Sequence, residues 1–199
     1  LPHVEAEPIK ETEEGAIEKT SIFQFPQLIF GVITLFMYVG VEVIAGDSIS
    51  AYGLALGLPV EQAKWFTTFT LFAMVGTYAL GVILIPKVIS QKTALLLSGL
   101  LGIVLSLVIV NTSGFTSVLL VASLGIANAL VWPAVWPLAL DGLGQFTKTA
   151  AAFLIMAISG GAILTPLYGR LVDYLNVQYL NGGMEEATAM SQSANQGYW

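Results

Sequence analysis

One carboxylate lies near the middle of an apolar segment, where an acidic side chain is costly. Glu42 is surrounded by apolar residues in the stretch 30–47, and an unpaired charge at the centre of a bilayer costs at least about 2.5 kcal/mol. Thr34, Tyr38 and Glu42 follow one another at four-residue intervals, which predicts a hydroxyl, a phenol and a carboxyl along one wall of a helix. Glu42 must therefore be protonated, paired or facing a wet cavity. The pattern favours a polar-substrate or proton site inside a membrane, and the alternative is a buried hydrogen bond that only holds helices together.

A second set of polar and aromatic residues recurs at the same interval. Asn128, Trp132 and Trp136 are four residues apart and are followed closely by prolines at 133 and 137. Pro133 and Pro137 each remove a backbone donor, so the helix should be bent or locally open, and such breaks are tolerated in membranes where they border a cavity. We expect Asn128 and Trp132 to line that cavity, whereas Trp136 is also typical of an interfacial anchor.

A glycine pair and a second carboxylate are weaker candidates for functional residues. The Gly160–Gly161 pair, followed by Pro166, indicates first a helix-packing surface and second a point of flexure. Asp47 comes five residues after Glu42 and so points about 140° away from it around a helix. That position favours a helix-end carboxylate in contact with water, with a coupling role beside Glu42 as the alternative.

Composition identifies the kind of protein that positions these residues. Hydrophobic residues make up 56% of the chain and charged residues 10%, with a mean hydropathy of +0.80, whereas a soluble domain carries about 25% charged residues. The seven basic residues are scattered and form no patch, which argues against nucleic-acid binding. Cysteine is absent and the single histidine is His3. The sequence therefore predicts an all-α integral membrane protein without thiol chemistry, metal or cofactor.

Apolar runs and polar connectors divide the chain into three parts. We expect an acidic cytoplasmic linker over 1–24, a transmembrane bundle over 25–170, and a polar outer-side segment over 171–199 that leads to a missing last helix. The predicted spans cover residues 27–52, 65–85, 93–110, 116–140 and 149–169. An inside location of the linker places five lysines inside against Lys64 and Arg170 outside, in agreement with the positive-inside rule. Five spans, an opening without methionine and an aromatic end indicate a fragment of a longer protein.

Four stretches carry a family resemblance that extends over about residues 25 to 175. Tyr38-Val-Gly-Val-Glu-Val43 resembles the signature of the seventh membrane helix in the fucose and glucose/galactose symporter family of the major facilitator superfamily. Asn128 with Trp132–Leu140 is similar to that family's tenth helix. Residues 143–148 and 160–169 resemble its following loop and eleventh helix. The resemblance implies the carboxy-terminal helix bundle of a major facilitator fold, with five spans seen and the sixth missing.

The resemblance also implies a function. Members of this family rock two six-helix bundles about a central site, so this chain would form one wall of a carrier in the cytoplasmic (inner) membrane and its partner would be the missing amino-terminal half. The expected substrate is a monosaccharide of the fucose, glucose or galactose type, coupled to H⁺ or Na⁺. We expect Tyr38, Glu42, Asn128 and Trp132 to bind the sugar, and Glu42 or Asp47 to couple the ion. The residues expected at gates or helix breaks are Pro133, Pro137, Gly160, Gly161 and Pro166.

Two departures from the family and two alternatives remain. The amino-terminal half is missing, and the connector between the second and third spans lacks the acidic and basic motif common in the superfamily. A membrane enzyme is disfavoured because no span contains histidine or cysteine, no Gly-x-Ser-x-Gly elbow appears and no carboxylates cluster. A non-transporting membrane scaffold or sensor derived from a transporter half is the other reading.

Overall fold

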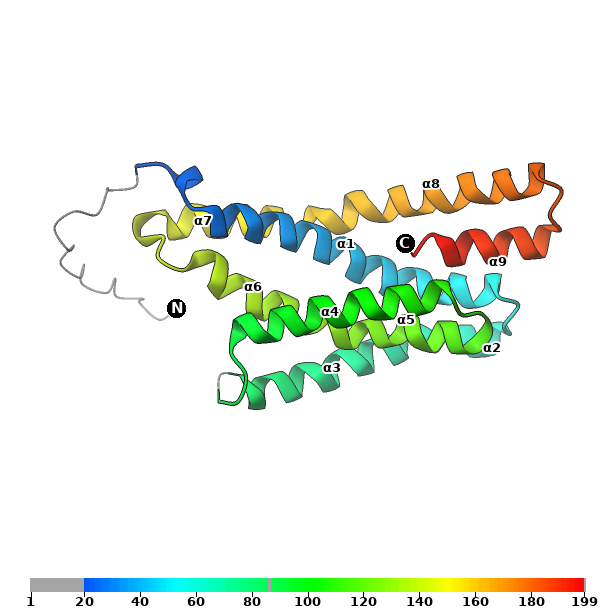
Figure 1. The fold of residues 1–199 in the computed structure, drawn as a ribbon, viewed down its shortest axis with the longest axis horizontal. Helices are drawn as coiled ribbons and strands as arrows, with labels where there is room; N and C mark the ends of the chain where they lie inside the picture. Colours follow the sequence, from blue (N-terminus) through cyan, green and yellow to red (C-terminus); the bar gives the residue numbers. More distant parts are fainter. Residues whose placement is uncertain (1–19, 86, 199) are drawn as a thin grey trace.

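A computed structural model of the chain describes residues 20–85 and 87–198, and all regular elements in this part of the chain are helices (Figure 1). Five helical segments are long and apolar enough to cross a membrane: Pro26–Ala55, Val60–Leu84, Gln91–Val110, Gly114–Leu140 and Gly144–Asn181. The prediction of an all-α membrane protein with five spans is confirmed. Most of the expected acidic linker, residues 1–19, lies outside the described residues.

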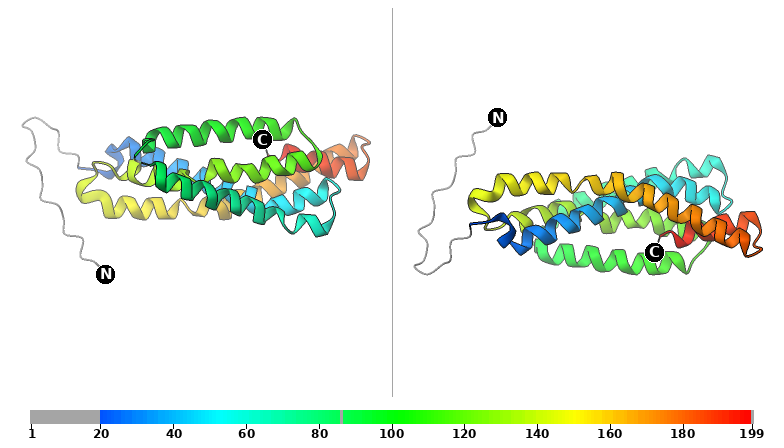
Figure 2. Two further views of the ribbon diagram at one scale, coloured as in Figure 1. Left: turned by 90° about the horizontal axis from the view of Figure 1, so that it is seen from below. Right: turned by 90° about the horizontal axis from the view of Figure 1, so that it is seen from above.

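The helices form an elongated bundle in which most elements run side by side. Their bounds are η1 (Ile22–Gln24), α1 (Pro26–Ala55), α2 (Val60–Ala63), α3 (Phe66–Leu84), α4 (Gln91–Val110), α5 (Gly114–Asn128), α6 (Val131–Leu140), η2 (Gly144–Phe146), α7 (Thr147–Met156), α8 (Ser159–Asn181) and α9 (Glu186–Gln196). Seen from below and from above, α4 lies along one side of the molecule and α7 along the other (Figure 2). α1 passes between them.

α1 is the central element of the bundle and packs against α8, α5, α6, α3 and α9. It begins with Pro26 at its first position, where a missing N–H costs nothing. The residues that it buries, among them Leu35, Val39 and Ile49, lie on one face, whereas Ile33 and Met37 on the opposite side are exposed. A helix that is apolar on all sides but buried on one is typical of a membrane span that packs on other helices with one side only.

Two of the five spans are interrupted near the middle of the bundle. The fourth span breaks at Ala129–Leu130, between α5 and α6. Pro133 has no N–H to donate to the carbonyl of Ala129, four residues earlier, so the break falls one turn before this proline. The fifth span breaks at Ala157–Ile158, between α7 and α8, whereas Pro137 and Pro166 lie inside continuous helices.

The buried apolar side chains fall into two separate clusters. The first core joins the beginning of α1 to α6 and α7, and its members include Leu35, Val135 and Leu154. The second core joins the end of α1 to α3, α4, α5 and α9, and its members include Ile49, Phe66 and Val121. α1 passes through both cores without interruption.

The polar carboxy-terminal segment is mostly helical over the residues that the structure describes. α8 continues to Asn181, beyond the span expected to end at 169, and the chain turns at Gly182 and Gly183, where Gly183 has φ +85°. α9 then runs back along α8 (Figure 1). Its small residues Ala189 and Ser193 are buried, so this polar helix packs closely on its neighbours.

Hydrogen bonds fix α9 to α1, to α4 and to the connection between α4 and α5. Asn195 donates to the hydroxyl of Tyr52 (2.7 Å), the carbonyl of Ile109 (3.1 Å) and the carbonyl of Thr112 (3.1 Å). The Tyr52 hydroxyl also shares a hydrogen bond of 2.5 Å with Ser117. One amide therefore connects the ends of α1, α4 and α5 through α9.

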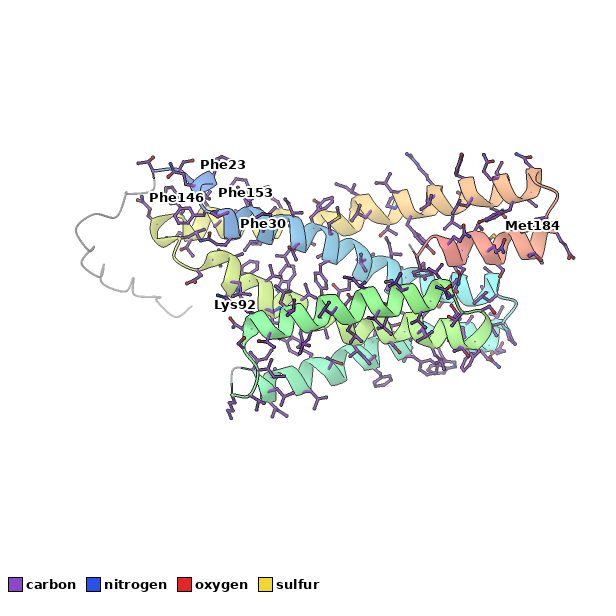
Figure 3. All side chains as sticks on the ribbon, viewed as in Figure 1. Phe23, Phe30, Lys92, Phe146, Phe153 and Met184 are labelled. Carbon is purple, nitrogen blue, oxygen red and sulfur yellow. The ribbon has the colours of Figure 1, made fainter. Side chains whose placement is uncertain are left out.

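The two ends of the bundle are distinguished by their labelled side chains in Figure 3. Phe23, Phe146 and Phe153 gather where α1 begins, and Lys92 lies at the same end, opposite Met184 (Figure 3). Phe23 packs on Phe153 with ring centroids 6.4 Å apart. The segment preceding α1 is thereby fixed against α7.

Candidate functional site

A cavity of about 410 Å³ opens between α1, α3 and the break that separates α5 from α6. α1 contributes a phenol and a carboxyl, α3 an aromatic and aliphatic wall, and α6 an indole. The lining residues are Tyr38, Glu42, Met74, Val75, Tyr78, Ala129, Trp132 and Pro133. Polar groups on one wall and flat apolar surface on another suit a small polar ligand that has an apolar face.

Glu42 lies at the middle of α1 and is partly buried. Tyr38 comes one helical turn earlier and lines the same cavity. The single ion pair among residues 20–85 and 87–198 joins Lys64 to Glu61 at an exposed position, so Glu42 has no basic partner there. Of the three environments that the sequence allowed for this carboxyl group, the structure provides the cavity.

Asn128 does not line this cavity, contrary to the expectation that it shares a hollow with Trp132. It lies on a second cavity of about 680 Å³ between α1, α4 and the carboxyl end of α5. Residues four positions apart in a regular helix drift about 40° per step, and the break at Ala129–Leu130 adds a further change of direction between Asn128 and Trp132. A pattern of fixed spacing could not reveal this divergence because it presupposes one continuous helix.

The expected wall of Thr34, Tyr38 and Glu42 is divided in the same way. Thr34 lines the second cavity, Glu42 the first, and Tyr38 both. Two steps of four residues rotate the side chains by roughly 80° around α1, which is enough to turn the first and last of the three toward different neighbours. Tyr38, with 8% of its surface exposed, separates the two hollows.

The two tryptophans of α6 stack on each other but have different surroundings. Their ring centroids are 5.6 Å apart, with an interplanar angle of 24°. Both rings pack against the first core, but Trp132 also reaches the first cavity, which Trp136 does not line. The stacked ring of Trp136 therefore supports the indole of Trp132.

The third wall of the cavity, on α3, was absent from the sequence-based expectations. Met74, Val75 and Tyr78 lie on one side of this helix. Tyr78 could have been chosen as a candidate from the sequence, because it places a phenol hydroxyl inside an apolar span. α3 can lie this close to α5 because residue 125 is a glycine. A Cβ at this position would stand 2.6 Å from the carbonyl oxygen of Thr70.

The remaining candidates lie away from the cavity, except Pro133. Asp47 is exposed, and Pro137 and Pro166 line none of the cavities described. Gly160 and Gly161 are buried at the contact between α8 and α1. Among residues 20–85 and 87–198, no three His, Cys, Asp or Glu residues are grouped as metal ligands would be.

Comparison with known proteins places the chain beside bacterial sugar carriers. A putative glucose/galactose transporter of Helicobacter pylori is 31% identical over 183 residues, which are 91% of this chain and 43% of that protein. A glucose/galactose transporter of Brucella abortus is 30% identical over 175 residues, covering 85% of this chain and 42% of that protein. No family model matches the chain.

The fold agrees with the same group. The crystal structure of the major facilitator superfamily transporter FucP, in the outward conformation, aligns with a TM-score of 0.71 and 21% identity. The alignment covers 86% of this chain and 40% of that structure. The chain therefore spans less than half the length of the proteins that it matches.

Proposed function

Because the chain belongs to the fucose and glucose/galactose transporter family of the major facilitator superfamily, we propose that it forms one half of a monosaccharide carrier. The observation that carries the proposal is the cavity at mid-membrane in which a carboxyl, a phenol and an indole converge from two helices. The carrier works by cation-coupled alternating access, with the sugar bound between this bundle and an amino-terminal half.

Each of the converging groups matches one requirement of a sugar. The Glu42 carboxylate accepts hydrogen bonds from sugar hydroxyls, and the Tyr38 hydroxyl both donates and accepts. Trp132 offers a flat surface to the apolar face of the pyranose ring. Asn128 faces the second cavity, so the sugar site proposed for the first cavity does not include it.

The coupling ion, H⁺ or Na⁺, is assigned to Glu42 as its second role. A mid-membrane carboxyl without a basic partner among the described residues is suited to exchanging a proton. One proton that moves inward down 100 mV releases about 2.3 kcal/mol. The exposed position of Asp47 makes it the weaker candidate.

The experiment that tests the proposal is uptake of labelled sugars by vesicles that hold the full-length protein. H⁺ and Na⁺ gradients are imposed in turn, and L-fucose, D-glucose and D-galactose are compared. The expected result is accumulation of at least one sugar under one gradient and counterflow of the same sugar without any gradient. Absence of both for all three sugars, in vesicles with correctly inserted protein, contradicts the proposal.

A further inference from the structure

The wall that α3 gives to the first cavity differs in chemistry from the wall that α1 gives. α1 presents the carboxyl of Glu42 and the hydroxyl of Tyr38. α3 presents Met74, Val75 and Tyr78. The isopropyl group of Val75 can make no hydrogen bond, and the thioether of Met74 is only a weak acceptor. The cavity is therefore polar along α1 and apolar over the first two residues of the α3 wall.

Met74 lies at about the same depth in the bundle as Glu42. α1 and α3 run in opposite directions and meet near their connection, where the Thr67 hydroxyl donates to the carbonyl of Gly46 (3.0 Å). About two helical turns lead along α3 from Thr67 to Met74. The same distance back along α1 from Gly46 ends at Val39, less than one turn from Glu42. The polar and the apolar wall therefore face one another at one level.

The backbone of α5 fixes the position of Met74. A Cβ on Gly125 would stand 2.9 Å from the Cγ atom of Met74, so this side chain packs directly on the glycine. Met74 is partly buried, whereas Val75 and Tyr78 are exposed. Met74 is therefore the deepest residue of the α3 wall.

A monosaccharide has one end that suits such a wall. A ring hydroxyl that is placed against apolar side chains loses its hydrogen bonds to water, and an unpaired hydroxyl in an apolar environment weakens binding. In a 6-deoxyhexose, C6 is a methyl group and needs no hydrogen bond. When the ring hydroxyls face Glu42 and Tyr38, C6 is the group that can lie on α3 without leaving a polar atom unpaired.

We propose that Met74 and Val75 hold the sixth carbon of the sugar and make the carrier prefer a methyl group there over a hydroxymethyl group. This inference rests on the proposed function, because it assigns an orientation to the sugar in the same cavity. A hydroxymethyl group would bring its hydroxyl against the Met74 thioether, where it lacks a good partner. Apolar sites discriminate against an added hydroxyl by up to about 100-fold, and we expect a preference of about 10- to 100-fold.

The test compares sugars that differ only by the hydroxyl on C6. L-Fucose is paired with L-galactose, and D-fucose with D-galactose. Each sugar competes with a transported labelled sugar in counterflow by vesicles that hold the full-length protein. The expected result is that the 6-deoxy member of at least one pair inhibits at a concentration about 10- to 100-fold lower than its partner. Equal potency within both pairs, or greater potency of the hydroxylated members, overturns this inference alone. Absence of transport for every sugar overturns the proposed function as well.

Variants of the α3 wall then assign the preference to its residues. Met74→Gln places an amide beside C6 at nearly the same volume, so the 6-hydroxyl gains partners and the ratio within the pair should fall to about one. Met37→Gln is the matched control, because Met37 lines the second cavity and its replacement should leave the ratio unchanged. Where Met74→Gln prevents folding, Val75→Thr, at an exposed position, should lower the ratio in the same direction.

Tyr78 provides the decisive comparison, because it carries the hydroxyl group of this wall. Tyr78→Phe removes that hydroxyl, and the ratio within the pair should persist even where both affinities fall. A ratio that disappears in Tyr78→Phe would assign C6 to the phenol and overturn the proposal. So would an unchanged ratio in Met74→Gln or, where that variant does not fold, in Val75→Thr.

Discussion

Glu42 and Trp132 are the residues whose environments distinguish a binding site from a packing contact. Both line a cavity that remains open beside them, whereas a carboxyl or indole that served packing alone would be enclosed. Nearby residues of the same types, Asp47 and Trp136, do not line it and serve as controls.

Glu42→Gln should weaken sugar binding about 10- to 100-fold, because a hydrogen bond to a charged group contributes roughly 1.5–3 kcal/mol. Counterflow and accumulation in vesicles measure the effect, with expression unchanged. Asp47→Asn should leave both activities intact, since Asp47 is exposed.

The two transport measurements separate the roles of Glu42. Retained counterflow with lost accumulation assigns ion coupling to this residue, and loss of both assigns sugar binding. Unchanged uptake returns Glu42 to a packing role.

Trp132→Ala should raise the half-saturating sugar concentration more than it lowers the Tm in detergent. Trp136→Ala should show the reverse order, because its ring packs against the first core without lining the cavity. The expected loss of affinity for Trp132→Ala is about 2- to 12-fold, which corresponds to an aromatic contact worth about 0.5–1.5 kcal/mol. A larger loss of stability than of affinity for Trp132 would make it structural.

At the scale of the elements, the sequence predicted the spans better than their internal breaks. Apolar runs of span length identify membrane helices whatever their neighbours are, so the five spans could be found. Pro133 correctly indicated an irregular fourth span. Its consequence for Asn128 could not be derived, because the direction of α6 depends on packing against α1 and α7. The polar helix α9 carried no periodic apolar signal, since its buried residues are small.

Pro133→Ala should close the break between α5 and α6 by restoring an N–H that can reach the carbonyl of Ala129. The added hydrogen bond should stabilise the bundle by about 1 kcal/mol, raising the Tm by a few degrees, while transport falls as the cavity is reshaped. Thermal unfolding in detergent and sugar counterflow measure the two effects. Pro137→Ala is the comparison, because that proline lies within a continuous helix. A fall in Tm with normal transport would show that the break is not a consequence of Pro133.

Asn195→Ala should loosen α9 from α1, α4 and the α4–α5 connection. The substitution leaves the buried Tyr52 hydroxyl and the carbonyls of Ile109 and Thr112 with fewer partners, at a cost of about 1–3 kcal/mol. Hydrogen exchange of the α9 amides should accelerate, while Asn181→Ala, at an exposed position, should have no effect. Unchanged exchange in the first variant would mean that small-residue packing alone holds α9.

At the scale of the whole molecule, basic residues distinguish the two ends of the bundle. Lys87, Lys92 and Lys148 lie in or beside the α3–α4 and α6–α7 connections, at the end where α1 begins, and Lys64 lies at the other end. The family could be inferred from motifs that survive at about 30% identity. The shape of the site could not be inferred from the sequence, because three helices that are separated along the chain meet to form it.

A membrane-impermeant maleimide should label K64C and N111C from outside intact cells, and K92C and K148C only after the membrane is opened. The reason is the positive-inside rule, which places the lysine-rich end in the cytoplasm. Labelling of all four positions from one side would contradict the orientation.

The position of Tyr38 has a consequence for the cavities on either side of it. Its ring is the common wall of two hollows, of about 410 and 680 Å³, on two sides of one helix. A shorter side chain at position 38 is expected to join the two hollows past α1. The size of the Tyr38 ring therefore matters for keeping them apart, besides its hydroxyl.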